Sequence, residues 1–358
     1  MIDGLSKNVF SQGKPSSSTV ARDEETLTAA EVIGHLALMV QRLPPEEIEN
    51  FYVALAPAVA TMAKTGKGTD ACLEHGCLPM PVHFYSPLPD IRDLQERGVY
   101  QRTSNLSGID WDLKRQSELL LYLGRRFGHE CDWSPKPAGN NDAFYTENGC
   151  FSFGCAAALH CILRFFQPQR IVEIGSGNSS QIINAAVLQN MKEFGRQCDY
   201  TIVDPYPDDA HIGKLQCVSN LLKQRVETLP VSFFSHLRDG DVLFIDSGHV
   251  VKTGGDVNYL ILEVLPRLAP GVIIHFHDIP MPYEYAEVYH TNPSFRMFWT
   301  ESYLLQAFLA FNNEFEILVS MAAVTSEMPE ILGAAFPLYD PACHLSGSQS
   351  IWLRRQKT

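Results

Sequence analysis

The feature that most constrains the fold of this chain is a short β-branched run that ends in a Gly-x-Gly turn. Residues 170–174 read Arg-Ile-Val-Glu-Ile, and Gly175-Ser176-Gly177 follow at once. A continuous apolar run of this length is typical of a parallel strand buried on both faces. Glycines after such a strand permit positive φ and close approach of the backbone to a ligand, and the following helix presents free N–H groups. We therefore expect a strand–turn–helix unit over residues 170–194, with a ligand at the turn.

The chain beyond this turn alternates between strand and helix patterns. Four further segments resemble buried strands: residues 200–204, a short stretch near 226, 241–246 and 272–276. Helical spacing of apolar residues marks four other segments: residues 152–166, 179–194, 212–224 and 256–268. A helix at 298–311 is then followed by two strands, 315–319 and 350–354. The pattern predicts an α/β fold, a Rossmann-like seven-stranded doubly wound sheet with an antiparallel C-terminal strand pair at its edge.

The first 150 residues differ in character from the sheet region. Residues 1–28 are rich in Ser, Gly and charged side chains without periodicity, which predicts a disordered tail. Residues 29–150 are expected to form a helical N-terminal cap and substrate region, with helices over 30–62, interrupted by a Pro-Pro pair, and over 112–127. The cofactor-binding domain is then expected to occupy residues 151–358.

Composition excludes several classes of protein. Hydrophobic residues make up 45% of the chain, enough to bury a core, and 28 Lys+Arg against 41 Asp+Glu give a net charge of −13. Because phosphate binding depends on Lys and Arg, we expect no nucleic-acid partner and no anionic membrane. The sequence has neither an apolar stretch approaching the ~20 residues of a membrane helix nor a signal-peptide pattern, so we expect a cytoplasmic protein.

The nine cysteines are scattered along the chain and are expected to be free thiols of a reducing compartment. Cys72, His75 and Cys77 combine the residue types that bind zinc at close spacing. They lack a second pair of ligands, so a loop with two ordinary thiols is the simpler interpretation.

A second acid follows the second expected strand. Asp204-Pro205 come directly after an apolar run, and a carboxylate at this position can accept both hydroxyls of a ribose. Together with Glu173 and the Gly-x-Gly turn, this arrangement resembles the class I S-adenosylmethionine-dependent methyltransferases. The resemblance covers about residues 150–320 and implies S-adenosylmethionine as the cofactor. It implies these cofactor-binding residues: Glu173, Gly175, Ser176, Gly177, Asn178, Ser179, Asp204, Pro205 and Asp246.

Two later runs resemble the branch of that superfamily that methylates small molecules. The runs Phe244-Ile245-Asp246-Ser247-Gly248-His249 and His277-Asp278-Ile279 match its pattern "IDxxH…HD", although Ser179 replaces the third glycine of the family turn. An NAD-dependent oxidoreductase is one alternative. Its turn has Gly-x-Gly-x-x-Gly and an acid ~20 residues on, whereas Ser180 occupies the third position here and Asp204 lies farther along. A non-catalytic binding protein that keeps the cofactor fold is the other alternative.

Four ionisable side chains are expected to meet where two strands end. Ligands of open α/β sheets bind outside the carboxyl ends of the strands, and Asp246, His249, His277 and Asp278 all lie there. Methyl transfer to a hydroxyl requires removal of a proton, for which an imidazole with a pKa near ~6.5 is suited. We predict O-methylation with His249 as the general base, His277 as the second candidate and Asp278 as a further catalytic residue. His275 lies within its strand and is expected to face the core.

A divalent metal is a separate question. Some O-methyltransferases that this chain resembles hold Mg²⁺ with carboxylates after the fourth and fifth strands, and Asp246 and Asp278 stand at those positions. Two carboxylates with waters and substrate oxygens can complete such a site. Alternatively, His249, His277 and Asp278 could form a 2-His-1-carboxylate set for a transition metal.

Side chains near these strand ends are candidates for binding a small-molecule acceptor. Tyr283 and Tyr285 follow the fifth expected strand, and Tyr145 and Asn148 precede the helix at 152–166. Trp299 fits either a wall of the pocket or core packing. The loop His83-Phe84-Tyr85 is, like Tyr145 and Asn148, a candidate lid. By analogy with other methyltransferases, the N-terminal helices build either the acceptor pocket or the face of a homodimer.

Overall fold

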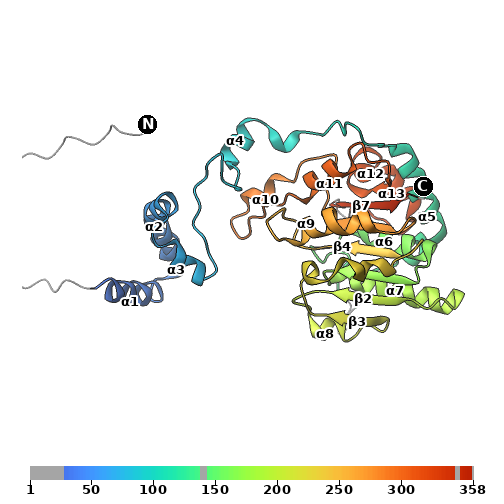
Figure 1. Cartoon of the computed structure of the whole chain (residues 1–358), viewed down its shortest axis with the longest axis horizontal. Coiled ribbons are helices and arrows are strands. Elements are labelled where there is room, and N and C mark those ends of the chain that lie inside the picture. Colours follow the sequence, from blue (N-terminus) through green and yellow to red (C-terminus); the bar gives the residue numbers. More distant parts are fainter. Residues whose placement is uncertain (1–27, 138–142, 343–346, 357–358) are drawn as a thin grey trace, which may run out of the picture. The chain divides into compact units, whose positions relative to one another are not determined.

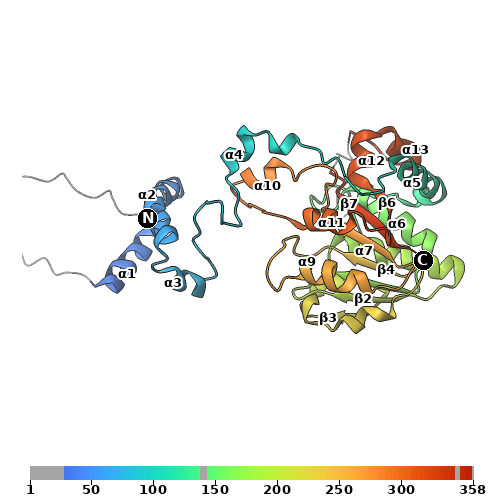
Figure 2. The same ribbon diagram turned by 45° about the horizontal axis from the view of Figure 1, so that its top comes forward.

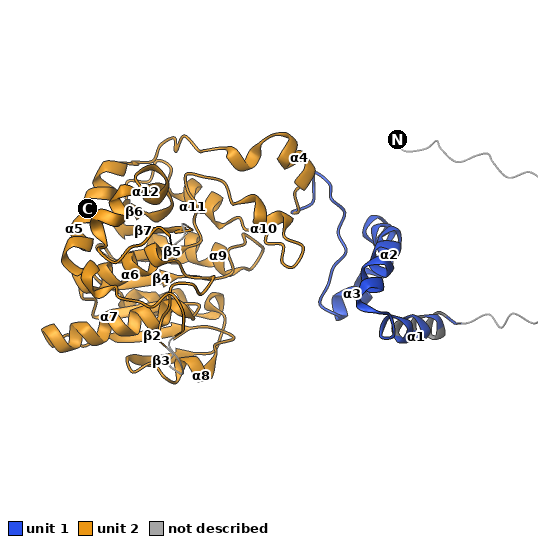
Figure 3. Ribbon diagram, turned by 180° about the vertical axis from the view of Figure 1, so that it is seen from behind, with its two compact units in different colours: residues 1–87 blue, residues 88–358 orange. Residues whose placement is uncertain are grey.

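The computed structural model describes residues 28–137, 143–342 and 347–356. The chain divides into two compact units, residues 1–87 and residues 88–358 (Figure 3). Residues 1–27, which make up nearly all of the predicted tail, lie outside the described residues.

Three helices make up the described part of the first unit: α1 (Ala29–Val40), α2 (Pro45–Thr65) and α3 (Thr69–Glu74). The expected interruption at Pro44-Pro45 separates α1 from α2, because proline suits the first turn of a helix. A further proline, Pro57, lies inside α2. Glu46 and Glu47 in that first turn favour the helix dipole, and Gly66 ends α2 with a φ of +70°. No side chain of α2 is buried.

The second unit contains a seven-stranded sheet in the order β3-β2-β1-β4-β5-β7-β6. Figure 1 shows this sheet with helices packed around it. Its strands are β1 (Arg170–Ile174), β2 (Asp199–Val203), β3 (Val218–Leu222), β4 (Val242–Ile245), β5 (Ile273–His277), β6 (Phe315–Ser320) and β7 (Ser350–Arg355). Neighbours among β1–β5 pair in parallel, whereas β7 pairs antiparallel with both β5 and β6. The predicted Rossmann-like sheet with an antiparallel C-terminal pair is confirmed.

Helices cover both faces of this sheet (Figure 2). One face is covered by α5 (Leu113–Phe127), α6 (Phe153–Phe166), α7 (Asn178–Phe194) and α13 (Glu330–Ala335). The other is covered by residues 257–268 and α11 (Glu301–Leu309). Successive strand residues alternate between the two cores, so that Phe244 packs with the first set and Ile245 with the second. The remaining helices are α4 (Ile91–Glu96), α8 (Asp209–Ile212), α9 (Asp256–Asn258), α10 (Glu287–Thr291) and α12 (Met321–Glu327).

The strand order creates a switch point between β1 and β4. The chain runs outward from β1 through β2 to β3 and then returns to pair β4 with the other side of β1. In open α/β sheets the crevice at such a point, outside the carboxyl ends of the strands, is where ligands bind. The turn between β1 and α7, Gly175-Ser176-Gly177, lies directly at this crevice.

Two of the expected elements are wrong. The helix predicted over 212–224 is instead the short α8 and the edge strand β3, and the strand predicted near 226 is a 3₁₀ turn, Val226–Thr228. Apolar residues three apart in this stretch (Ile212, Leu215, Val218, Leu221) imitate a helix, but pairing of the edge with β2 prevails. The helix predicted over 256–268 forms, although Tyr259–Val264 within it is π-helical.

The boundary between the two units differs from the predicted one. The division falls after Pro87, whereas the sequence placed it after residue 150. Helix α5 explains the difference, because it packs against α6 and α13 and buries Leu120, Leu123 and Phe127 in the core of the sheet unit. None of the helices that the structure describes is long and apolar enough to span a membrane.

Candidate active site

The turn after β1 is packed tightly against the end of β4. Gly175 has a φ of +81°, and a Cβ atom there would lie 2.0 Å from the carbonyl oxygen of Asp246. The Gly175 amide donates to Val203 O (3.0 Å) and the Asp246 amide donates to Ile174 O (2.9 Å). Only glycine meets both demands at this position, since a side chain would be strained and would also displace β4. The turn is thereby held at the switch point.

Glu173 lies beneath this turn. Its carboxylate is fully buried and accepts hydrogen bonds from Ser179 Oγ (2.7 Å), Ser180 Oγ (2.9 Å) and the Tyr200 hydroxyl. Burial raises its pKa to about 7, although the three hydroxyls oppose the shift. The structure therefore places Glu173 as an anchor of α7 on the sheet, which differs from its predicted contact with the cofactor.

A cavity of about 470 Å³, here called the β1–β4 cavity, opens above the turn. Four of the predicted cofactor-binding residues line it: Gly175, Asp204, Pro205 and Asp246. Asp204 is oriented by Ser176 Oγ, which donates to its Oδ2 at 2.6 Å, and by the Tyr206 amide, which donates to its Oδ1 at 2.8 Å.

The other predicted residues of the turn have supporting positions. The Gly177 amide donates to Ser180 Oγ (3.1 Å), Asn178 begins α7, and Ser179 is buried against Glu173. Residues 225–227 and Lys252 also line the β1–β4 cavity, and sequence reasoning missed them. Residues 225–227 were missed because the strand was misplaced there, and no motif of the sequence distinguished Lys252.

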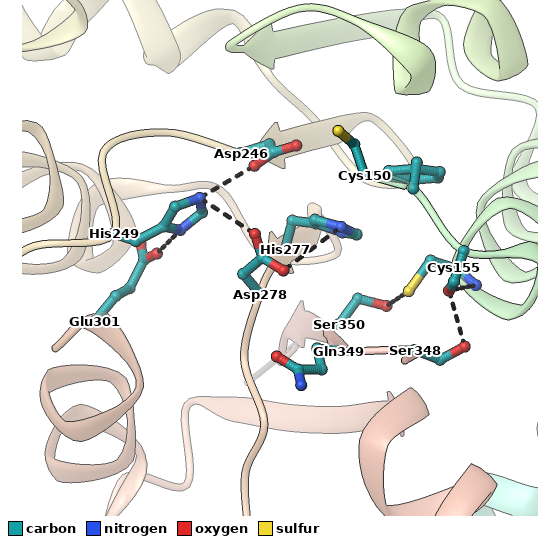
Figure 4. A network of polar contacts seen from close by, with 12 residues as sticks. Cys150, Cys155, Asp246, His249, His277, Asp278, Glu301, Ser348, Gln349 and Ser350 are labelled. Carbon is teal, nitrogen blue, oxygen red and sulfur yellow. Dashed lines mark hydrogen bonds and ion pairs between the residues drawn. The ribbon is translucent and has the colours of Figure 1, made fainter. Parts of the chain in front are cut away.

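His249 lies at the centre of a cluster of ionisable side chains, shown in Figure 4. Its Nε2 lies 3.3 Å from Asp246 Oδ1 and 3.6 Å from Asp278 Oδ2, and its Nδ1 lies 2.8 Å from Glu301 Oε2. His249 and Asp278 both have left-handed backbones, with φ of +55° and +54°. Left-handed non-glycine residues are uncommon and gather at functional sites. The cluster joins the ends of β4 and β5 to the first turn of α11.

The ionisable groups of this cluster shift one another's pKa values. Burial opposes the charged form of His249, but hydrogen bonds to Asp246 and Glu301 outweigh it and raise its pKa well above 6.5. Burial likewise disfavours charge on Asp246, yet the neighbouring His277 and His249 lower its pKa. Burial raises the pKa of Asp278. The surrounding carboxylates therefore favour the charged form of His249 and make its imidazole a stronger base.

A second cavity of about 420 Å³, here called the β5 cavity, is lined in part by Asp278 of this cluster. Its lining includes Asp278, Tyr289, Gln349, Glu147 and Phe151. Asp246 lines the β1–β4 cavity and Asp278 lines the β5 cavity, and His249 contacts both carboxylates. The predicted catalytic residues thus meet between two hollows.

The two other histidines of β5 are less central. His277 is buried, its ring stacks on Phe151 at 4.6 Å, and its Nε2 lies 3.9 Å from Asp278 Oδ1. His275 is fully buried and stacks on Phe244, as expected of a core residue, and burial lowers its pKa well below 6.5.

The residues predicted to bind the acceptor do not line either cavity. Asn148 holds a turn, because its side chain donates to Tyr145 O (2.7 Å) and accepts from the Phe151 amide (2.7 Å). The Tyr283 hydroxyl donates to Glu327 (3.1 Å). Tyr285 is 2% exposed, and its hydroxyl accepts from the Ser302 amide (3.0 Å). The structure brings Tyr289 and Gln349 to the β5 cavity instead, and neither belonged to a recognisable motif.

Three side chains are placed as a metal ion would require. Within the described residues, Asp246, His249 and Asp278 each offer a ligand atom, and these atoms lie within 4.8 Å of one another. This set includes both predicted carboxylates and takes Asp246 in place of His277. Cys72, His75 and Cys77, considered for zinc, are not gathered in this way in the part of the chain that the structure covers.

The sheet order and the cavity at the switch point are those of an open α/β fold, in which ligands bind outside the carboxyl ends of the strands. A sequence model described as a methyltransferase domain matches residues 172–279, which contain Asp246, His249 and Asp278. Residues 172–279 are thus a methyltransferase domain, set in a Rossmann-like seven-stranded sheet.

Several known proteins are similar to this chain. An uncharacterised protein of Archaeoglobus fulgidus is 32% identical over 180 residues, which are 48% of this chain and 80% of that protein. The plantazolicin methyltransferase BpumL, solved in complex with SAH, is 14% identical with a TM-score of 0.33, covering 75% of this chain and 98% of its own. A candidate methyltransferase of Thermobifida fusca is 14% identical with a TM-score of 0.35, covering 72% and 96%.

Proposed function

We propose that this protein transfers the methyl group of S-adenosylmethionine to a hydroxyl of a small polar molecule, with His249 as the general base. One observation carries the proposal: His249 Nε2 lies between a carboxylate of the β1–β4 cavity and a carboxylate of the β5 cavity. The cofactor would occupy the first cavity, with its ribose hydroxyls on Asp204. The acceptor would occupy the second.

The reaction is an in-line displacement. The acceptor oxygen attacks the sulfonium methyl, the carbon–sulfur bond breaks, and S-adenosylhomocysteine leaves as a neutral thioether. His249 Nε2 takes the hydroxyl proton, and Asp246 and Asp278 stabilise the imidazolium that forms. Asp246 and Asp278 would share their charge with a sulfonium bound beside them, which would favour the neutral form of the His249 ring before the transfer. Holding the acceptor against the methyl group supplies the rest of the rate enhancement.

The lining of the β5 cavity supports a class of acceptor. Its described lining contains two carboxylates, Asp278 and Glu147, together with the polar groups of Thr146, Tyr289 and Gln349, and no Lys or Arg. Such a surface suits hydroxyl-rich neutral molecules or cations and disfavours phosphates and carboxylates. A volume of about 420 Å³ is that of a small-molecule site.

Titration calorimetry tests the proposed function. The full chain should bind S-adenosylmethionine and S-adenosylhomocysteine but not NAD. Asp204→Ala should weaken both by about tenfold or more, because it loses charge-assisted hydrogen bonds to the ribose. His249→Asn should retain binding. A folded chain that binds neither compound would show that it is a binding protein of another kind, and binding of NAD would favour the oxidoreductase.

A divalent cation is a second candidate for the cluster, favoured by the mutual approach of Asp246, His249 and Asp278. The donor set fits, since carboxylates are the preferred ligands of Mg²⁺ and a ligating imidazole usually donates its other N–H to a carboxylate, here Glu301. Mg²⁺ there would lower the pKa of an acceptor hydroxyl. Titration of the chelator-treated chain with Mn²⁺ should give binding that Asp278→Asn removes, and no binding in the wild type would leave His249 to act alone.

A further inference from the structure

We propose that Glu301 is a positioning residue that fixes the His249 ring with Nε2 facing the two cavities. The inference rests on the proposed function and identifies how the base is held. Glu301 lies 52 residues farther along the chain, in the first turn of α11, and belongs to neither the Gly-x-Gly turn nor the motif that contains His249.

The contact between the two side chains determines the state of the ring. His249 Nδ1 lies 2.8 Å from Glu301 Oε2, and Glu301 is fully buried. A carboxylate accepts hydrogen bonds only, so Nδ1 must carry the proton of this contact. Nε2 is then the nitrogen left to exchange a proton near Asp246 and Asp278. A ring turned over by 180° would present the wrong nitrogen to the cavities.

The backbone at the start of α11 holds the same residue. The amides of Thr300 and Glu301 both donate to His249 O, at 2.9 and 3.1 Å, and Thr300 Oγ accepts from the Val251 amide at 2.7 Å. The first N–H groups of a helix need acceptors from outside it, and the left-handed His249 supplies one. The unusual backbone of the β4 loop is thus compensated by α11.

Trp299 completes this support from the same segment. Its ring centroid lies 4.7 Å from that of His249, with an interplanar angle of 52°. Residues 299–301 therefore contact His249 through a ring, two amides and a carboxylate. A fully buried carboxylate is costly unless it is paired, and the imidazole is the partner that the structure gives it.

Proton NMR of the full-length chain tests the assignment. A proton held between an imidazole Nδ1 and a buried carboxylate resonates far downfield of the backbone amides. The wild type should show one such resonance that disappears in His249→Asn, which assigns it. In Glu301→Gln it should be lost or move clearly upfield, because the charged acceptor is gone, and in Glu301→Asp it should be retained with altered position.

A matched control separates this effect from general disturbance. Tyr100→Phe removes the hydroxyl 2.9 Å from Nδ1 of another buried histidine, His290, and should leave the His249 resonance unchanged. A His249 resonance that is absent in the wild type, or that stays in place in Glu301→Gln, overturns the proposal.

Calorimetry on the same samples keeps the two proposals distinguishable. Glu301→Gln should bind S-adenosylmethionine within about twofold of the wild type, since Glu301 does not line the β1–β4 cavity. If the wild type does not bind S-adenosylmethionine, the proposed function is refuted. The NMR resonance then still tests the contact between His249 and Glu301. Loss in Glu301→Gln alone would contradict a role confined to the ring of His249.

Discussion

The carboxyl group of Glu173 is fully buried beside the Gly-x-Gly turn. Glu173 is the residue before the last of β1, and three hydroxyl groups donate hydrogen bonds to it. Three hydrogen bonds satisfy its oxygens, yet burial still raises its pKa from 4.5 to about 7. Glu173 therefore holds the turn in place, and the free-energy cost of burying its carboxyl group depends on pH.

The sign of that dependence follows from the raised pKa. The folded chain binds this proton more tightly than the unfolded chain, so the contribution of Glu173 to stability is fully present below about pH 4.5 and is lost as pH rises through about 7. The shift of the pKa from 4.5 to about 7, at ~1.36 kcal/mol per pKa unit, corresponds to a change of about 3 kcal/mol in the free energy of unfolding.

We predict that Glu173→Gln removes most of this pH dependence. The amide keeps the shape of the side chain and can still hydrogen-bond to the hydroxyls, but it carries no charge to bury. Urea unfolding at pH 5 and pH 8 should give a smaller difference between the two free energies of unfolding than in the wild type. Glu263→Gln, at a half-exposed side chain on the surface, is the control and should leave the difference unchanged. An equal pH dependence in Glu173→Gln would contradict the prediction.

At the scale of elements, strands buried on both faces were predictable from the sequence. The segments of β1, β2, β4 and β5 are short apolar runs enclosed by two cores, and no competing periodicity obscures them. The edge strand β3 was missed because only one of its sides is paired, and its half-exposed residues carry a spacing that also suits a helix. Edge strands of this kind are decided by tertiary pairing.

The candidate site likewise contains residues that the sequence predicted and residues whose role depends on tertiary contacts. Asp204, Asp246, His249 and Asp278 follow predicted strands, so the rule on carboxyl ends finds them. Glu301 could not be found, because its contact with His249 depends on where α11 begins relative to the β4 loop. Tyr283 and Tyr285 were selected by proximity in sequence to β5, but their hydroxyls bond to Glu327 and the Ser302 amide. Distance along the chain is a poor guide once a loop turns away from the sheet.

At the scale of the whole molecule, residues 88–358 contain both hydrophobic cores, both cavities and every residue of the candidate site. Residues 1–87 are a separate compact unit. Its helices instead expose large apolar side chains: Val32, Leu36, Leu38 and Met39 on α1, and Tyr52, Val53 and Val59 on α2. Such faces are uncommon on a protein without a partner.

We propose that these faces associate in a homodimer, and we predict that removing residues 1–87 separates assembly from cofactor binding. The fragment 88–358 should bind S-adenosylmethionine within about twofold of the full chain, because it contains the residues that line the β1–β4 cavity. Light scattering after size-exclusion chromatography should give a dimer for the full chain and a monomer for the fragment, since burial of apolar surface drives association. The double variant Leu38→Glu/Met39→Glu should reproduce the monomer at full length. A fragment that still dimerises would place the interface in the sheet unit, and a monomeric full chain would mean that these faces do not serve self-association.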